Sequence, residues 1–125
     1  MKSISPNFFV NDLEATINFY TKLGFNLTDE VTTAEGEKVF AMMTSGNVTF
    51  MFQTFASIEG KHPMVSRVDG GSLVLYIAID NIREYYDHIK EQVMVLTDLE
   101  KTFYGATEFS ICDNNNYLIT FAEHD

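Results

Sequence analysis

The sequence predicts an α+β fold built from two halves with the same order of elements. An apolar run ending at Val10 leads to Asp12 and an amphipathic segment, and a second apolar run ending at Ile79 leads to Asp80 and another amphipathic segment. Three strand-like runs then follow each amphipathic segment. Asp12 and Asp80 therefore take equivalent places in two half-modules, and two such halves suggest a shared cleft.

The first half is predicted to form one strand, one helix and three further strands. Residues 4–10 are an apolar run, and Pro6 within it indicates an edge strand or a bulge. Asp12 is a good helix N-cap, and apolar side chains recur at helical spacing until Gly24 ends the helix. The later strands are expected at 25–33, 39–43 and 48–54.

The second half is predicted to repeat this order after a long connection. The segment between the halves lacks periodicity and holds Gly60 and Pro63. A strand at 72–79 precedes a helix whose apolar positions fall at i, i+3, i+4 and i+7 from Ile82. The last strands are expected at 93–96, 108–112 and 117–122. We therefore predict one domain, 1–125, with modules 1–54 and 71–125 joined by residues 55–70.

Composition limits the class of protein and its partners. The chain has 125 residues, which suits a single domain with a real core, and its formal net charge is −10. Nucleic acid and anionic membranes are disfavoured, because both need clustered Lys and Arg. No apolar run is long enough for a membrane span, there is no signal-peptide pattern, and Cys112 is the only cysteine, so we expect a cytoplasmic protein. The acidity either attracts a cationic ligand or serves solubility.

Four segments carry a family resemblance over nearly the whole chain. They are Val10–Phe25, Met51–Gln53, Leu75–Asn81 and Phe103–Phe121. In this order they resemble the glyoxalase/bleomycin-resistance/extradiol-dioxygenase superfamily, also called vicinal oxygen chelate proteins. Asp113-Asn114-Asn115-Asn116 stands where that family more usually has Asp-Pro-Asp-Gly. The resemblance implies paired βαβββ modules that form a curved mixed sheet around a cleft, commonly in dimers.

The resemblance also implies where a metal ion would bind. In the family's metalloenzymes, the first and last strands of each module each supply a His, Glu or Gln ligand. The matching positions here are Ser5, one residue within 48–52, Val74 and Thr120. None of these is a competent ligand for a tightly held divalent ion. We therefore predict no metal site and no cofactor.

The remaining reactive side chains predict no catalytic residue. His88 is expected on the polar side of the second helix, and His124 is expected in a frayed tail. His62 lies in the connection, where it is either an ordinary exposed residue, a ligand contact or a base. Cys112 has no nearby base or helix start in the sequence and is expected to pack as a small apolar residue.

Aromatic side chains are the remaining signal for a binding site. Strand alternation and the resemblance together give a set of predicted ligand-binding residues: Asn7, Phe9, Phe40, Phe50, Phe52, Tyr76, Tyr104 and Glu108. A shift of one residue in the strand 48–54 would replace Phe50 and Phe52 by Met51 and Gln53. The alternative is that most of these aromatics belong to the core or to a dimer interface.

The function predicted from these observations is small-molecule binding of the bleomycin-resistance type. A homodimer would sequester an aromatic or cationic ligand in an apolar cleft, without metal chemistry. The alternative is a lyase, isomerase or dioxygenase relative with a non-standard site, in which His62, Glu108 or Tyr104 does acid–base work. A structural dimer with a filled cleft is a third hypothesis. The ligand's identity, and whether modules pair within a chain or swap between chains, stay open.

Overall fold

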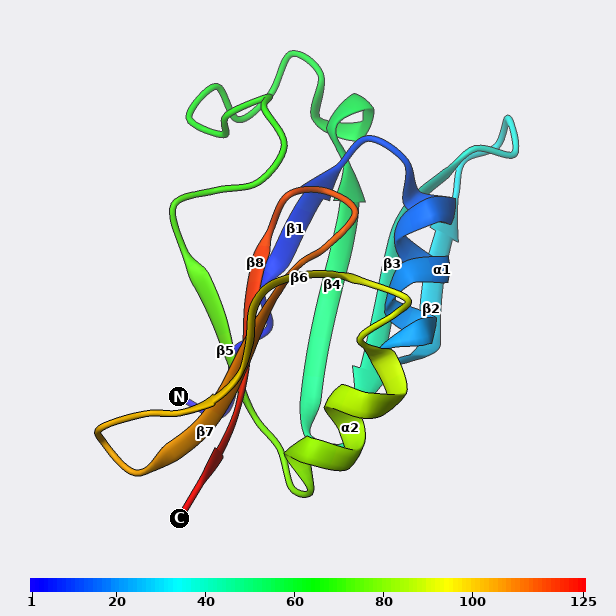
Figure 1. Cartoon of the computed structure of the whole chain (residues 1–125). Helices are drawn as coiled ribbons and strands as arrows, with labels where there is room; N and C mark the ends of the chain where they lie inside the picture. The colour runs from blue at the N-terminus through cyan, green and yellow to red at the C-terminus, as the bar shows by residue number, and fades with distance from the viewer. The chain divides into compact units, whose positions relative to one another are not determined.

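The computed structural model describes all 125 residues, which form two compact units, Met1–Asp69 and Gly70–Asp125. Each unit contains one helix and one four-stranded mixed sheet in the order β-α-β-β-β (Figure 1). The predicted α+β fold of two βαβββ modules is confirmed. Neither helix has the length and apolar character that crossing a membrane would require.

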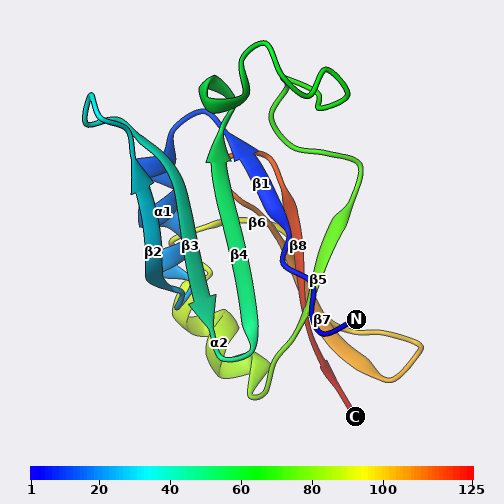
Figure 2. The same cartoon turned by 180° about the vertical axis from the view of Figure 1, so that it is seen from behind.

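Unit 1 has the strand order β1-β4-β3-β2, and β1 runs parallel to β4 (Figure 2). Its elements are β1 (Asn7–Val10), α1 (Leu13–Lys22), β2 (Asn26–Thr32), β3 (Lys38–Ser45), β4 (Val48–Thr54) and the short 3₁₀ turn η1 (Phe55–Ile58). The first strand begins three residues later than predicted. Pro6 has no N–H to donate to a sheet, although its carbonyl still accepts from Met51 N at 2.9 Å.

The core of unit 1 is a cluster of aromatic rings between α1 and the sheet. Tyr20 of α1 is fully buried, and its ring lies 4.8 Å from that of Phe52. Phe25 stacks on Phe50 at 5.1 Å, and Phe8 lies against both strand phenylalanines. Each such ring contributes roughly 1.5–3 kcal/mol by burial. One face of this sheet is therefore taken up by packing under the helix.

Unit 2 repeats the arrangement with the strand order β5-β8-β7-β6, in which β5 is parallel to β8. Its elements are β5 (Val74–Ala78), α2 (Ile82–Ile89), β6 (Met94–Lys101), β7 (Ala106–Cys112) and β8 (Leu118–His124). Both β6 and β8 run further than predicted. The extra length of β8 brings His124 into the sheet, opposite Ala106.

The core of unit 2 also lies under its helix. Phe109 and Phe121 stack at 5.1 Å between ring centroids, and the rings of Tyr85 and Tyr86 pack on them from α2. Ile82 and Ile89 are buried at the two ends of the helix, as their spacing predicted. As in unit 1, the helix covers only one face of the sheet.

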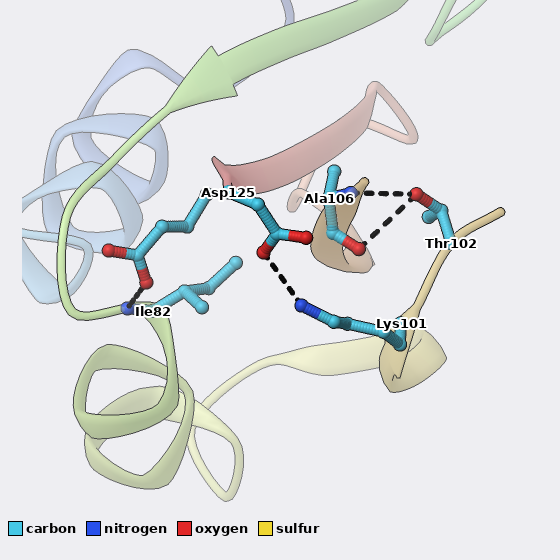
Figure 3. Close-up of polar contacts among 6 residues, drawn as sticks. Ile82, Lys101, Thr102, Ala106 and Asp125 are labelled. Atoms are coloured by element: carbon cyan, nitrogen blue, oxygen red, sulfur yellow. Dashed lines mark hydrogen bonds and ion pairs between the residues drawn. The ribbon is translucent and has the colours of Figure 1, made fainter. Parts of the chain in front are cut away.

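The two helices begin in different ways, so Asp12 and Asp80 are not equivalent. Asp12 caps α1 by accepting the N–H of Ala15 at 3.0 Å. Asp80 does not cap α2, whose N-cap is Asn81, in the left-handed region and without a capping side chain. Glu123 of β8 supplies the cap instead, accepting from the backbone N–H groups of Asn81 at 3.0 Å and Ile82 at 3.1 Å (Figure 3 draws the bond to Ile82).

Candidate ligand-binding site

Each sheet has a second face that the helix of its own unit does not cover, and we call it the open face. Strand register assigns the side chains, because directly paired residues point to the same side. The open face of unit 1 carries Asn7, Phe9, Phe40, Met42, Met51 and Gln53. The open face of unit 2 carries Tyr76, Glu108, Ser110, Thr120, Ala122 and His124. Most of the predicted ligand-binding residues fall in these two sets.

Phe50 and Phe52 do not lie on the open face, and their assignment to the ligand is corrected. Their side chains are only 3% and 0% exposed and pack under α1. Because β4 alternates, the neighbouring Met51 and Gln53 point to the open side. The one-residue choice that the sequence left open is therefore decided in favour of Met51 and Gln53.

The open face of unit 1 is uncharged and carries a chain of side-chain hydrogen bonds. Asn7 donates its amide N–H to Gln53 Oε1 at 3.0 Å, and Gln53 donates to Ser57 Oγ at 3.0 Å. Ser57 in turn donates to the carbonyl of Thr54 at 2.7 Å. This chain fixes the orientation of the Gln53 amide between two ordered partners. The half-buried ring of Phe9 lies beside it, 6.1 Å from that of Phe55.

The open face of unit 2 brings three predicted site residues into direct contact. One oxygen of Glu108, Oε2, accepts from the hydroxyl of Tyr76 at 2.5 Å and from that of Tyr104 at 2.6 Å. The two tyrosines remain 47% and 52% exposed, so their rings are accessible beside the carboxylate. The result is a carboxylate held between two phenol rings on a sheet surface.

Tyr76 reaches Glu108 because a small residue lies between their strands. Tyr76 is on β5 and Glu108 on β7, and β8 runs between them. Ala122 of β8 is directly opposite Glu108, and Thr120 is opposite Tyr76. The methyl group of Ala122 is fully buried and leaves room for the tyrosine to cross the strand diagonally.

Tyr104 is positioned by the turn between β6 and β7. The backbone N–H of Thr102 donates to Ala106 O at 2.7 Å, and the N–H of Ala106 donates to Thr102 Oγ1 at 3.1 Å. Gly105 adopts a φ of 86°, which glycine tolerates and the closing of this turn requires. Lys101 pairs with Asp125 at 2.6 Å beside the turn (Figure 3). Tyr104 therefore extends from a fixed hairpin turn.

His124 was missed by sequence reasoning and belongs to this cluster. Its Nε2 lies 3.1 Å from the hydroxyl oxygen of Tyr76. The prediction of a frayed tail was wrong, because β8 continues to His124. A signal was present in the sequence: the alternation that puts Thr120 and Ala122 on one face puts His124 there too.

The carboxylate changes the acidity of both phenols and has no basic partner. The hydrogen bond to Glu108 raises the pKa of Tyr76 to about 12 and also raises the pKa of Tyr104. Both hydroxyls therefore stay protonated at neutral pH. The Lys and Arg residues of unit 2 are Arg83, Lys90 and Lys101, and none of them is bonded to Glu108. The residue paired with Glu108 on β6 is another acid, Glu100.

The residues at the family's metal positions do not fit a metal ion. Val74 offers no donor atom, and Thr120 is largely buried with its hydroxyl bonded to Ser110 at 2.8 Å. No group of three or more His, Cys, Asp or Glu side chains in the chain is arranged to hold a metal ion.

Two hollows lie away from the open faces, near the helix starts. One, of about 430 Å³, is lined by Asp80, Asn81, Glu84, Tyr85 and His88. The other, of about 500 Å³, lies beside the start of α1 and the turn before β3. Neither is lined by a predicted ligand-binding residue. His62 lies in the segment between the units and is exposed, with no group bonded to its ring.

Comparison with known families identifies the chain's relatives. Residues 4–121 match the model of the Glyoxalase/Bleomycin resistance protein/Dioxygenase superfamily. The chain belongs to this superfamily. The predicted resemblance is therefore confirmed over nearly the full length. None of the curated proteins compared with the chain matches it.

Several solved structures share the fold at low sequence identity. TioX from Micromonospora sp. ML1 is 16% identical with a TM-score of 0.79, and a bleomycin-binding protein complexed with bleomycin is 18% identical with a TM-score of 0.67. Both alignments cover 100% of each chain. A glyoxalase-related enzyme from Clostridium phytofermentans is 16% identical with a TM-score of 0.76, covering 100% of this chain and 96% of its own. A binding protein and an enzyme thus share this fold, so the fold alone does not determine whether a protein binds or catalyses.

Proposed function

We propose that this superfamily member binds an aromatic or cationic small molecule on the open face of unit 2, without metal chemistry. The observation that carries the proposal is the Glu108 carboxylate, bonded to the hydroxyls of Tyr76 and Tyr104 and without a basic partner. A cation with N–H donors would bond to the second carboxylate oxygen, Oε1, for which the structure shows no partner. The phenol rings would pack against the ligand's apolar part.

The energies of these contacts suit a reversible binder. A cation–π contact contributes about 0.5–2 kcal/mol, depending on desolvation. A hydrogen bond between a cation and a carboxylate is roughly twice as strong as a neutral one. The formal net charge of −10 would add long-range attraction for cations, falling with ionic strength.

The open face of unit 1 is proposed as a separate binding surface. Phe9 and Phe40 supply half-buried aromatic surface, and Asn7 supplies an exposed amide. Because this face bears no charge among its register-assigned residues, it would bind apolar or hydrogen-bonding molecules rather than charged ones.

A titration with two matched probes tests the proposal. Phenethylammonium and phenethyl alcohol have the same aromatic body and differ in charge. In two-dimensional NMR spectra, phenethylammonium should change the amide chemical shifts of Tyr76, Tyr104 and Glu108. Phenethyl alcohol should need a roughly tenfold higher concentration to produce the same changes. Equal responses to both probes, or responses confined to the hollow lined by Glu84 and His88, would contradict the proposal.

An enzyme with a non-standard site is the alternative function. Glu108 accepts a hydrogen bond from Tyr104 at 2.6 Å, and in such an enzyme the carboxylate would act as a general base beside the phenol. Metal analysis of the purified protein helps to distinguish the enzyme from the metal-free binding protein. One tightly bound divalent ion per chain would contradict metal-free binding. The homodimer remains a prediction that light scattering can test.

A further inference from the structure

His124 lies beside the proposed cation site, next to Tyr76. Its ring lies on the same open face as Glu108 and is separated from that carboxylate by one hydroxyl group, that of Tyr76. The imidazole is exposed, so it can exchange protons with water. Histidine is the side chain whose charge ordinarily changes between about pH 5 and 8.

Counting protons fixes the direction of each bond in this chain of groups. Tyr76 has one hydroxyl proton, and it donates that proton to Glu108 at 2.5 Å. The hydroxyl oxygen can then only accept from His124, so Nε2 must carry a hydrogen. The neutral histidine is therefore the Nε2–H tautomer, and its Nδ1 is the nitrogen that takes up a proton on acidification.

We propose that His124 makes cation binding at Glu108 depend on pH: the neutral imidazole permits the cation, and the imidazolium opposes it. This inference rests on the proposed function and concerns the regulation of the same site. Protonation of Nδ1 leaves every hydrogen bond of the cluster in place and adds a positive charge. The imidazolium thus acts as an internal counter-ion of Glu108 and repels an external cation.

The other charged groups around His124 do not supply this response. Asp125 is paired with Lys101, and Glu123 is bonded to the start of α2. Glu100 faces Glu108 from β6, and Asp80 follows β5 at the same end of the sheet. Tyr104 is the other tyrosine on this face, and like Tyr76 it donates a hydrogen bond to Glu108. Carboxylates, lysines and tyrosines ordinarily titrate outside the range of histidine.

Calorimetric titration with phenethylammonium at about pH 6 and about pH 8 tests the proposal. The probe keeps its charge at both values. We expect the Kd to be roughly three- to tenfold larger at the lower pH. The His124 imidazolium and the probe's ammonium group repel each other, and solvent near the surface screens that repulsion. Repeating the titration in buffers of different ionisation enthalpy should show release of part of a proton per cation bound in this range.

Two variants separate His124 from other causes. His124→Gln keeps an N–H donor for Tyr76 and cannot titrate, so the Kd should become equal at the two pH values. His88→Gln, on the exposed side of α2, is the matched control and should keep the wild-type pH dependence. An unchanged pH dependence in H124Q would overturn the proposal.

The outcomes distinguish this inference from the proposed function. Equal wild-type affinities at both pH values would overturn the pH dependence and leave cation binding standing. Absence of phenethylammonium binding at either pH would count against the proposed function and, with it, the regulation. The ligand-free protein gives a separate test: long-range ¹⁵N NMR should show the Nε2–H tautomer of His124 when neutral, and the Nδ1–H tautomer would contradict the mechanism.

Discussion

The two units share one plan, but their open faces differ in chemistry. In unit 1, amides and a hydroxyl connect Asn7, Gln53 and Ser57, and no member of this chain ionises. In unit 2, the corresponding surface holds a carboxylate, phenols and an imidazole. The repeated β-α-β-β-β order therefore determines which face of each sheet is open. The individual strand residues determine whether that face responds to charge and pH.

The largest expected difference lies between the two faces of β4 in unit 1. Phe52→Ala should destabilise the protein by about 3–5 kcal/mol, because the ring is fully buried and packed in the cluster around Tyr20. Met51→Ala, one residue away on the open face, should cost much less. Urea denaturation followed by circular dichroism measures both. Similar losses for the two variants would contradict the assignment of faces.

A smaller difference is expected between the two helix caps. Asp12→Ala removes a local cap and should cost about 1 kcal/mol. Glu123→Ala removes two charge-assisted bonds that also tie α2 to β8, and should cost about 2–3 kcal/mol. Urea denaturation compares the two variants. A larger loss of stability in D12A than in E123A would show that the long-range cap contributes less than the local one.

The smallest effect concerns the acidity of Tyr76. Its folded-state pKa is raised to about 12, above the ordinary value of about 10, so its contribution to stability is complete below the ordinary value and is lost as pH rises toward 12. Glu108→Gln should lower the pKa of Tyr76, because it removes the carboxylate that favours the protonated phenol. Ultraviolet absorbance titration detects the phenolate, and Tyr76→Phe identifies which transition belongs to Tyr76. An unchanged transition in E108Q would show that the carboxylate is not the cause.

The fold was predictable from sequence because its signals are local. Alternating apolar strands, helical spacing and the stop at Gly24 each lie within a few residues of the element they specify. Tyr76, Tyr104 and Glu108 were predicted as ligand-binding residues on separate grounds: Tyr76 from strand alternation, Tyr104 from its place beside Gly105, and Glu108 as a source of charge. Their contact with one another required the register of three strands, which no local pattern contains.

Other parts of the site depend on long-range or fine register. The alternation of β4 is offset by one residue from the predicted one. Phe50 and Phe52 therefore lie in the core and not on the predicted ligand face. The cap of α2 by Glu123 joins groups more than 40 residues apart in sequence. His124 lies beyond the predicted end of β8 at Ala122, so no predicted strand includes it, whereas β8 continues to His124.

The binding of a cation by Glu108 is tested by measuring the Kd of phenethylammonium for three proteins at about pH 8. Wild type and Glu84→Gln, a charge-matched change on α2 away from the open face, should bind with equal Kd. Glu108→Gln should bind roughly tenfold more weakly, because it loses the charge while keeping a side chain of the same shape. Equal binding by E108Q and the wild type would contradict the account, and a loss in E84Q alone would place the cation beside α2 instead.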